Sequence, residues 1–432
     1  MTEKNQNEDR VTYTKTYMYY TVLVMGMINL IDIFTSNVAP LVVTYVVDEF
    51  FISKGIPENV AYAQYGLVMS LVSIFMLFGL VVRYFADRYG RKPALIINII
   101  GMSLSALLVL FSLNFFMYAL GVLLGAVFLN ADIQMLLVGE ECPKEMRSQY
   151  INGVRIVGLC GALLVLVLRF IFISGSNPQW RLLWLLPLIG GIIVTVIAIF
   201  TIKESSIYLT MKAKRLAHPE LQQQKESFIR ALKSIRKLKN YKLIMITLVI
   251  GILAVLGAFT DSNYMQPYLS QNFTFNEVNI IYIIRFVISI PVSAVIGLIN
   301  DRFGRKIGLY LHLILIPICL IIFIIFVHAG NFIIAGIFYG VFIYSVWLTP
   351  ATTGTIISEL TPTKYRGTVG VYSLIIAYIL LAVAMVFFSI LKLWLTFETL
   401  FLIAFIPGCL IAIPIVIKYV PETKGTDLTK VE

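Results

Sequence analysis

Long apolar segments alternate with short polar ones along the whole chain. Twelve of the apolar segments have about 20 residues or more, which is roughly the length that a helix needs to cross the hydrocarbon core of a bilayer. Because lipid offers no water to unpaired backbone groups, each segment is predicted to be an α-helix. They lie near 18–47, 64–85, 93–112, 115–138, 151–173, 181–202, 243–269, 278–299, 307–328, 331–357, 368–391 and 397–420. The pattern predicts an all-α integral membrane protein with twelve transmembrane helices.

The charges determine the expected orientation. Of the 432 residues 59% are hydrophobic and 13% charged, and the formal net charge is +11. Lys and Arg gather in alternate loops, which indicates that those loops and both termini face the cytosol of a multi-pass plasma-membrane protein. The polar segment after Met1 predicts that the first helix is itself the targeting signal. This placement of charge argues against a nucleic-acid partner.

Two charged motifs occur twice, about half a chain apart. The stretch GLINDRFGRK at 297–306 resembles FADRYGRK at 85–92, and Asp301 follows Asp87 by 214 residues. The spacing Glu-x-x-Pro-x-x-x-Arg begins at Glu140 and again at Glu359. Two six-helix repeats in equal register are typical of transporters that rock one half against the other.

A basic segment separates the two repeats. We expect an N-terminal half at 1–202, a cytoplasmic linker at 203–242 with eleven Lys or Arg, and a C-terminal half at 243–432. Apolar residues recur at helical spacing inside the linker, which favours a basic amphipathic helix on the inner leaflet. A solvated tether explains the composition equally well. The apolar positions are Phe228, Leu232, Ile235 and Leu238.

These motifs resemble those of the major facilitator superfamily. The pattern G-x-x-x-D-R-x-G-R-K that starts at Gly297 is similar to the superfamily motif between helices two and three and between helices eight and nine. WRLLW at 180–184, KESSIYL at 203–209 and PETKG at 421–425 resemble the sugar-porter branch. The resemblance covers the whole chain. It implies an alternating-access carrier whose ion pairs at the inner face lock the outward-facing state.

The duplicated charges are therefore candidates for a cytoplasmic gate. Arg302 and Arg305 can bridge to acids such as Glu359, and Gly297 allows close approach of a neighbouring helix. The charges also act as topology signals, which is the simpler explanation for them. The first copy has Arg83 in place of the first glycine, and Gly79 one turn earlier could substitute. The candidate gate residues are Asp87, Arg88, Gly90, Arg91, Glu140, Arg147, Gly297, Asp301, Arg302, Gly304, Arg305, Glu359 and Arg366.

Three acids and two arginines lie well inside apolar segments. Facing lipid, the five would together cost roughly 12–18 kcal/mol, so they are expected to line a wet cavity or to pair with one another. Asp32, about halfway along the first helix, is the candidate proton-coupling residue, and Asp132 is a second one. The alternative for both is a structural salt bridge. Proton symporters that resemble sugar porters often pair such an acid with an arginine in the fourth helix, which this chain lacks.

Arg155 and Arg285 are the candidate solute ligands. Arg155 lies about 12 Å along the fifth helix from Arg147, at a position where the resemblance implies a substrate-binding glutamine. A guanidinium there suits a carboxylate or a phosphate. The alternative is that both arginines only neutralise the intramembrane aspartates, in which case the solute would be a neutral sugar or polyol.

The seventh apolar segment contains the polar sequence GAFTDSNYMQPYL. Asp261, Asn263 and Gln266 are candidate solute ligands there, and the sequence predicts a helix break before Pro267 near the outer mouth. The glutamine-rich signature of sugar porters is missing from this segment. Trp347 in the tenth segment is a candidate aromatic wall of the solute site, although packing is the commoner role of such a residue.

The sequence therefore predicts a secondary carrier for a small organic solute. An organic anion in symport with protons is favoured, and a solute sensor with the same fold is the alternative outside transport. P-loop, GxSxG and HExxH motifs are absent, which argues against an enzyme, and we expect no cofactor and no metal. The expected partners are the solute, protons and membrane lipids, and the expected assembly is a monomer.

Overall fold

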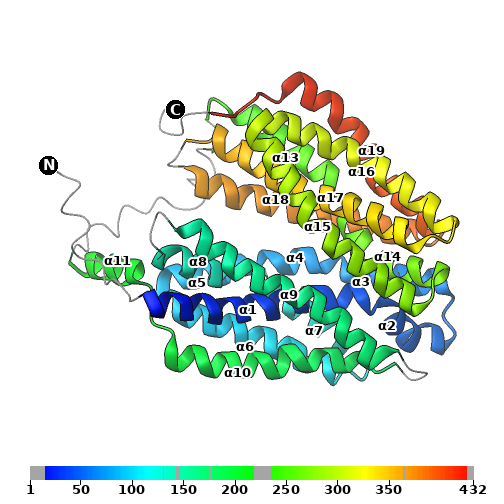
Figure 1. Cartoon of the computed structure of the whole chain (residues 1–432), viewed down its shortest axis with the longest axis horizontal. Coiled ribbons are helices and arrows are strands. Elements are labelled where there is room, and N and C mark those ends of the chain that lie inside the picture. Colours follow the sequence, from blue (N-terminus) through cyan, green and yellow to red (C-terminus); the bar gives the residue numbers. More distant parts are fainter. Residues whose placement is uncertain are drawn as a thin grey trace. The chain divides into compact units, whose positions relative to one another are not determined.

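The computed structural model describes residues 15–129, 131–142, 146–174, 178–217, 235–236, 238–362 and 365–425. Those residues form helices and connecting turns, and they contain no strand. Twelve helices or helix series are long and apolar enough to cross a membrane (Figure 1). The predicted all-α fold with twelve spans is confirmed. Phe228 and Leu232 of the predicted amphipathic linker helix lie outside the described residues.

The chain forms two compact units that are not simple sequence halves. The N unit comprises Met1–Leu41 and Phe75–Lys225, and the C unit comprises Val42–Ile74 and Glu226–Glu432. The segment Val42–Ile74, which contains the connection after the first span and the first part of the second span, therefore packs with residues from the second half of the sequence. Its α3 lies against α18, and its α2 lies against α14.

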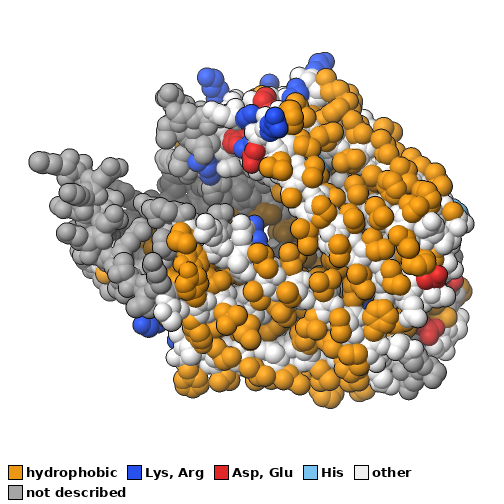
Figure 2. Space-filling view, in the orientation of Figure 1, with side chains coloured by type: hydrophobic (Ala, Val, Ile, Leu, Met, Phe, Trp, Pro, Cys, Tyr) orange, Lys and Arg blue, Asp and Glu red, His pale blue; other side chains and the backbone are white. Residues whose placement is uncertain are grey.

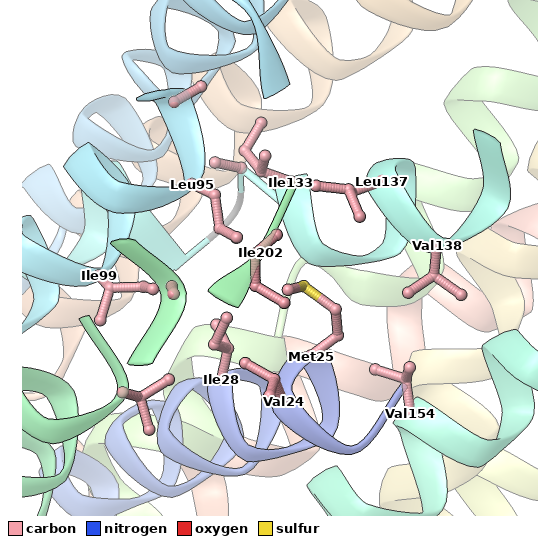
Figure 3. Close-up of a cluster of buried hydrophobic side chains, with 14 of the residues drawn as sticks. Val24, Met25, Ile28, Leu95, Ile99, Ile133, Leu137, Val138, Val154 and Ile202 are labelled. Carbon is pink, nitrogen blue, oxygen red and sulfur yellow. The ribbon is translucent and has the colours of Figure 1, made fainter. Parts of the chain in front are cut away.

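The N unit is built around a layer of apolar side chains from its six spans. Val24 and Ile28 meet Leu95, Ile133 and other fully buried residues (Figure 3). The helix α1 packs along α9 and α10, and α6 packs against α7 and α10. The helices are α1 (Lys15–Leu41), α5 (Gly79–Tyr89), α6 (Arg91–Leu110), α7 (Phe115–Leu129), α8 (Ile133–Glu141), α9 (Arg147–Ile173), η3 (Trp180–Trp184), α10 (Leu185–Thr201) and α11 (Ser206–Ala217).

The C unit is centred on the long helix α17. This helix packs against α13, α15 and α16, and α19 covers α13 and α16. The helices are α2 (Val43–Phe50), η2 (Ile52–Lys54), α3 (Glu58–Met69), α13 (Tyr241–Val255), α14 (Ala258–Asn272), α15 (Phe275–Phe303), α16 (Arg305–His328), α17 (Phe332–Leu360), α18 (Arg366–Leu391) and α19 (Phe397–Tyr419). A further short helix, α4 (Leu71–Leu77), crosses the boundary between the units.

Several spans are interrupted rather than continuous. The fourth span stops at Leu129 and resumes at Ile133, and the seventh changes helix at Leu256 and Gly257. A Cβ on Gly257 would come within 2.7 Å of the Phe405 ring, so only glycine lets this second break lie so close to α19. The predicted break before Pro267 is wrong, because α14 continues through that proline. Side chains around a proline can satisfy the backbone group that it leaves free.

The outer surface fits a lipid environment. On the face drawn in Figure 2 hydrophobic side chains predominate, and most Lys, Arg, Asp and Glu lie near the margins. Large apolar residues are widely exposed, such as Phe200 at 82% and Leu298 at 70%. A bilayer rather than water is the solvent in which such a surface is stable.

Candidate functional site

Asp32 is a buried carboxylate without a basic partner in the described part of the chain. It lies on α1 and is 7% exposed. Gln134 donates from Nε2 to Asp32 Oδ2 at 3.1 Å, and the same nitrogen lies 3.4 Å from Asn29 Oδ1. None of the ion pairs among the described residues includes Asp32. A carboxylate held by one neutral amide can gain or lose a proton without breaking a salt bridge.

Asp132 lies at the break in the fourth span and has a different environment. Its backbone is left-handed, with φ of 48° and ψ of 31°, and it precedes the first turn of α8. Arg83 of α5 reaches across the break, donating from Nη2 to Asp132 Oδ2 at 2.9 Å and from Nε to the Ala131 carbonyl at 2.9 Å. The residue that departed from the glycine pattern is thus the direct partner of the second candidate acid.

Arg155 is exposed on α9. Its charge acts on Asp132 from a distance, but it forms no ion pair with any residue that the structure describes. Arg155 therefore does not neutralise an intramembrane aspartate through a salt bridge in this structure, which was the alternative role for it.

In the C unit, Asp261 and Arg285 are linked through a tyrosine. The Tyr339 hydroxyl donates to Asp261 Oδ1 at 2.9 Å. The Arg285 guanidinium lies over the rings of Tyr339, Phe286 and Tyr282 at 5.0, 5.2 and 5.6 Å from their centroids. Its Nε is enclosed by protein and has no hydrogen-bond partner among the described residues. The cation is held by aromatic faces and by the more distant Asp261 charge.

The other predicted solute ligands of the C unit differ in how far their polar groups are already hydrogen-bonded. The Gln266 amide is already hydrogen-bonded within the protein. Its Oε1 accepts from Thr44 N and Oγ1 at 2.8 and 2.7 Å, and its Nε2 donates to Ser270 at 3.0 Å. Asn263 is buried, and among the described residues its amide donates only to the Met385 sulfur, at 3.7 Å. Trp347 is 49% exposed on α17. Gln266 is thus a structural residue in this arrangement, whereas Asn263 keeps hydrogen-bonding capacity.

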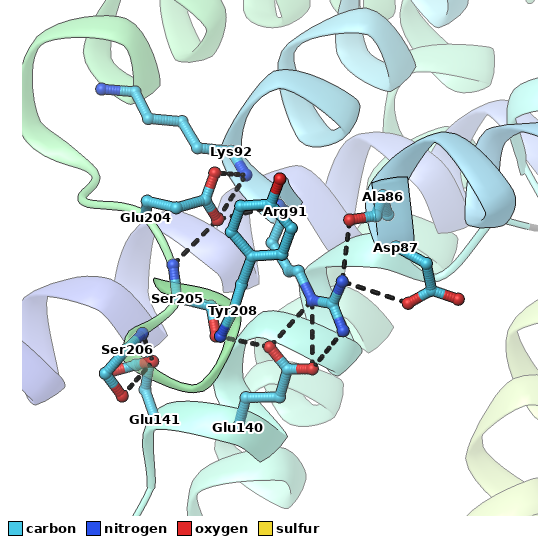
Figure 4. Close-up of polar contacts among 10 residues, drawn as sticks. All are labelled: Ala86, Asp87, Arg91, Lys92, Glu140, Glu141, Glu204, Ser205, Ser206 and Tyr208. Carbon is cyan, nitrogen blue, oxygen red and sulfur yellow. Dashed lines mark hydrogen bonds and ion pairs between the residues drawn. The ribbon is translucent and has the colours of Figure 1, made fainter. Parts of the chain in front are cut away.

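The first copy of the gate motif forms a closed polar cluster (Figure 4). Arg91 is 4% exposed and donates to Glu140 from Nη2 at 2.7 Å, to the Ala86 carbonyl at 2.7 Å and to Asp87 at 3.1 Å. Glu204 accepts from the backbone N–H of Arg91 at 2.8 Å and caps α6. Gly90 has φ of 122°, and a Cβ there would collide with the Glu204 carboxylate. The glycine is required for this acid to reach the helix end.

The second copy repeats these contacts more loosely. Arg305 donates to the Asn300 carbonyl at 2.7 Å and to Asp301 at 3.0 Å, and its Nε lies 3.4 Å from Glu359 without hydrogen-bond geometry. Glu422 caps α16 through the backbone N–H of Arg305 at 2.9 Å. Gly304 has φ of 108°. The internal repeat of the sequence thus corresponds to two clusters with equivalent partners, of which the second is held less tightly.

Four other predicted gate residues are not part of these clusters. Arg302 and Arg88 are exposed and lie over Phe303 and Tyr89, and Arg366 donates to the carbonyls of Ser358 and Thr361. No described atom lies within 4 Å of a Cβ built on Gly297, so the close helix contact expected there is absent. That side of α15 is uncovered, as the exposure of Leu298 shows. The side chain of Arg147 lies outside the described part of the structure.

Sequence reasoning missed five residues that complete these sites. Glu204 and Glu422 lie inside KESSIYL and PETKG, so an acid within each of these two motifs was an available signal. Gln134, Arg83 and Tyr339 had no such signal, because only the fold brings them to Asp32, Asp132 and Asp261.

The comparison with protein families agrees with this architecture. The family model described as Major Facilitator Superfamily matches residues 22–374. The chain belongs to the Major Facilitator Superfamily. It is thus a membrane transporter of this family.

The named relatives share low sequence identity with this chain. A candidate proline/betaine transporter of Staphylococcus haemolyticus is 23% identical over 307 residues, 66% of this chain and 62% of that protein. The class H tetracycline resistance protein of Pasteurella multocida is 24% identical over 147 residues, 33% of this chain and 36% of that protein. The matches thus span less than two thirds of either relative.

Solved structures match over nearly the whole length. A D-xylose-proton symporter has a TM-score of 0.71 at 18% identity, with 95% of this chain and 99% of that chain covered. An inward-open structure of the xylose transporter XylE from E. coli has a TM-score of 0.74 at 17% identity, covering 96% and 99%. A peptide transporter has a TM-score of 0.66 at 14% identity, covering 92% and 94%. At these identities the likeness establishes the fold alone.

Proposed function

We propose that this transporter carries a small organic anion across the plasma membrane in symport with protons. The observation that carries the proposal is Arg285, whose Nε has no hydrogen-bond partner among the described residues. Enclosing an arginine nitrogen without a partner is costly, and a carboxylate or phosphate oxygen would satisfy it. Asp261 is occupied by Tyr339 and leaves this nitrogen available to a solute. Arg155 offers a second unpaired cation in the N unit.

The proton site in this proposal is Asp32. Among the described residues, its hydrogen bond comes from the neutral amide of Gln134. A carboxylate that is buried and unpaired exchanges its proton when its surroundings change between apolar and wet. Proton and anion then favour each other's binding by reciprocal coupling, because the proton removes a negative charge that repels the anion.

The duplicated clusters serve as the inner gate in this proposal. The moving bodies are the halves 1–202 and 243–432, joined by the basic linker, and both termini are cytoplasmic. We infer a monomer in contact with bilayer lipids. Opening the inner face would require the contacts of Arg91 and Arg305 to loosen, which the left-handed glycines next to them permit.

The second candidate is a neutral sugar or polyol as solute. The structural match to a D-xylose-proton symporter favours it. In that case Arg155 and Arg285 would have only structural roles, and a neutral solute would bind the amide of Asn263 and other uncharged groups.

A thermal-shift screen followed by uptake separates the two candidates. The purified protein is screened against monocarboxylates, dicarboxylates, organic phosphates, sugars and polyols. We expect an acid to stabilise it, and we expect Arg285→Gln and Arg155→Gln each to weaken that binding about 10- to 150-fold, the range for a hydrogen bond to a charged group. Arg181→Gln, which removes an arginine bound to the Ser112 carbonyl, is the matched control.

Uptake into proteoliposomes tests the coupling of solute transport to protons. Asp32→Asn should abolish accumulation driven by a pH gradient while labelled solute still exchanges. If only polyols or sugars stabilise the protein, the anion claim fails. If Asp32→Asn accumulates solute like the parent, the proton assignment fails.

A further inference from the structure

The break in the fourth span lies directly beside the candidate proton site. α7 ends at Leu129, Asp132 takes the left-handed conformation, and α8 begins at Ile133. Asp132 is the one non-glycine residue with positive φ in the described ranges. Aspartate tolerates this conformation better than most residues, but the site still needs support from its surroundings.

Arg83 supplies that support. Its planar fork donates from Nε to the Ala131 carbonyl and from Nη2 to the Asp132 carboxylate, both at 2.9 Å. The carbonyl is one that a continuous helix would have bonded internally, and the carboxylate would otherwise be an unpaired charge. One guanidinium thus holds two adjacent residues of the break, Ala131 and Asp132, which a single-point cation could not do. We call this arrangement the Arg83 clamp.

The clamp fixes the first turn of α8. The backbone N–H groups of Met135 and Leu136 bond to the Asp132 carbonyl at 3.1 and 3.2 Å. Gln134 lies in the same turn and donates to Asp32 at 3.1 Å. Whether this amide reaches Asp32 therefore depends on where α8 begins.

We propose that Arg83 is a positioning residue for proton exchange at Asp32, acting through the first turn of α8 and the amide of Gln134. The inference rests on the proposed proton role of Asp32. A hydrogen bond donated to a carboxylate favours its charged form, so a closed clamp favours release of the proton and an open clamp favours its uptake. An event that loosens Arg83 from the break would thereby load Asp32.

Other charges around the clamp must be separated from this effect. Asp132 is faced by Arg83 from α5, by Arg155 from α9 and by Asp32 from α1. Removing Arg83 also leaves the Asp132 charge uncompensated, which by itself would favour a proton on Asp32. The test therefore includes a double variant that removes both charges of the clamp.

The experiment follows the carboxyl band of Asp32 by infrared spectroscopy during a pH titration of the purified full chain in lipid. The band is assigned by its loss in Asp32→Asn, and no solute is needed. We expect Arg83→Gln and Gln134→Leu each to move the midpoint of the band to higher pH by about 1–2 units. The double variant Arg83→Gln/Gln134→Leu should move it no further, because both changes remove one hydrogen bond. Arg83→Lys, which keeps the charge and is less disruptive to folding, should move it in the same direction by less.

Two comparisons decide between positioning and charge. Arg83→Gln/Asp132→Asn should keep the shift, since the clamp is still absent, and a return to the parent midpoint would overturn the inference in favour of electrostatics alone. Arg181→Gln in the same unit should leave the midpoint unmoved. An Asp32 band that stays in place in Arg83→Gln and Arg83→Lys contradicts the inference alone. If Asp32→Asn removes no band, both this inference and the proposed proton role are wrong.

Discussion

The Tyr339 hydroxyl donates to the Asp261 carboxylate at 2.9 Å while the face of the same ring lies 5.0 Å from the Arg285 guanidinium. One side chain thus serves both charges of the C unit. The acid is satisfied by a hydroxyl, so the cation is stabilised without becoming one half of a direct salt bridge. This arrangement keeps Arg285 available for an anion.

Tyr339→Phe tests this division of roles. The ring that supports Arg285 remains, but Asp261 loses its donor and is expected to turn toward the guanidinium. Binding of an acidic solute should then weaken about tenfold or more, measured by thermal shift against solute concentration. Tyr282→Phe is the control, because its ring also supports Arg285 and its hydroxyl does not bond Asp261. Equal binding by Tyr339→Phe and the parent would contradict this interpretation.

The two gate clusters should differ in their contribution to stability. The Arg91 side chain is 5% exposed and that of Arg305 is 20% exposed, and their nearest contacts to Glu140 and Glu359 are 2.7 and 3.4 Å. Arg91→Gln leaves a buried carboxylate unpaired, a loss of about 3–5 kcal/mol. Arg305→Gln should cost clearly less. The measurement is the melting temperature of each variant in the same detergent, and a larger loss for Arg305→Gln would be the contrary result.

Asp301→Asn separates gating from stability. The Asp301 side chain is 78% exposed and pairs with Arg305 across the turn between α15 and α16. An exposed pair of this kind contributes only about 0.2–1 kcal/mol. We expect a nearly unchanged melting temperature together with slower transport and greater reactivity of an engineered cavity thiol from the cytosolic side. If thiol reactivity and transport both match the parent, the motif acts as a topology signal.

Glu422 gives a pH-dependent prediction. Its partial burial opposes ionisation, but hydrogen bonds from the backbone N–H groups of Lys424, Arg305 and Lys306 lower the pKa of this carboxyl. A carboxyl whose pKa is lower in the folded than in the unfolded state stabilises the protein at pH values above the unfolded-state pKa. That stabilisation is lost as the pH falls through the folded-state pKa. Glu422→Gln should therefore melt earlier than the parent at pH 7, and the difference should shrink below about pH 4.5. A constant difference between pH 7 and pH 4 would contradict the assignment.

Much of the fold follows from local properties of the sequence. Twelve apolar segments had to become helices because lipid leaves unpaired backbone groups no other partner. The duplicated motifs identified Arg91, Glu140, Arg305 and Glu359 as gate residues, because these charges recur at matching places in the two repeats. The bridge expected from Arg305 to Glu359 is present at 3.4 Å. The break at Pro267 was also predicted from a local property, the proline itself. That prediction was wrong, because α14 continues through Pro267, which is buried by the surrounding packing.

The chain by itself thus determined its class, its twelve helices, its repeat and the identity of its intramembrane charges, since each depends on composition or on spacing within one segment. Only the tertiary structure decided which partner each charge has. Gln134 donates to Asp32, Arg83 to Asp132 and Tyr339 to Asp261, and each donor comes from a different helix. Contacts between helices depend on the rotation and depth of each helix in the packed unit, and a one-dimensional pattern does not contain those quantities.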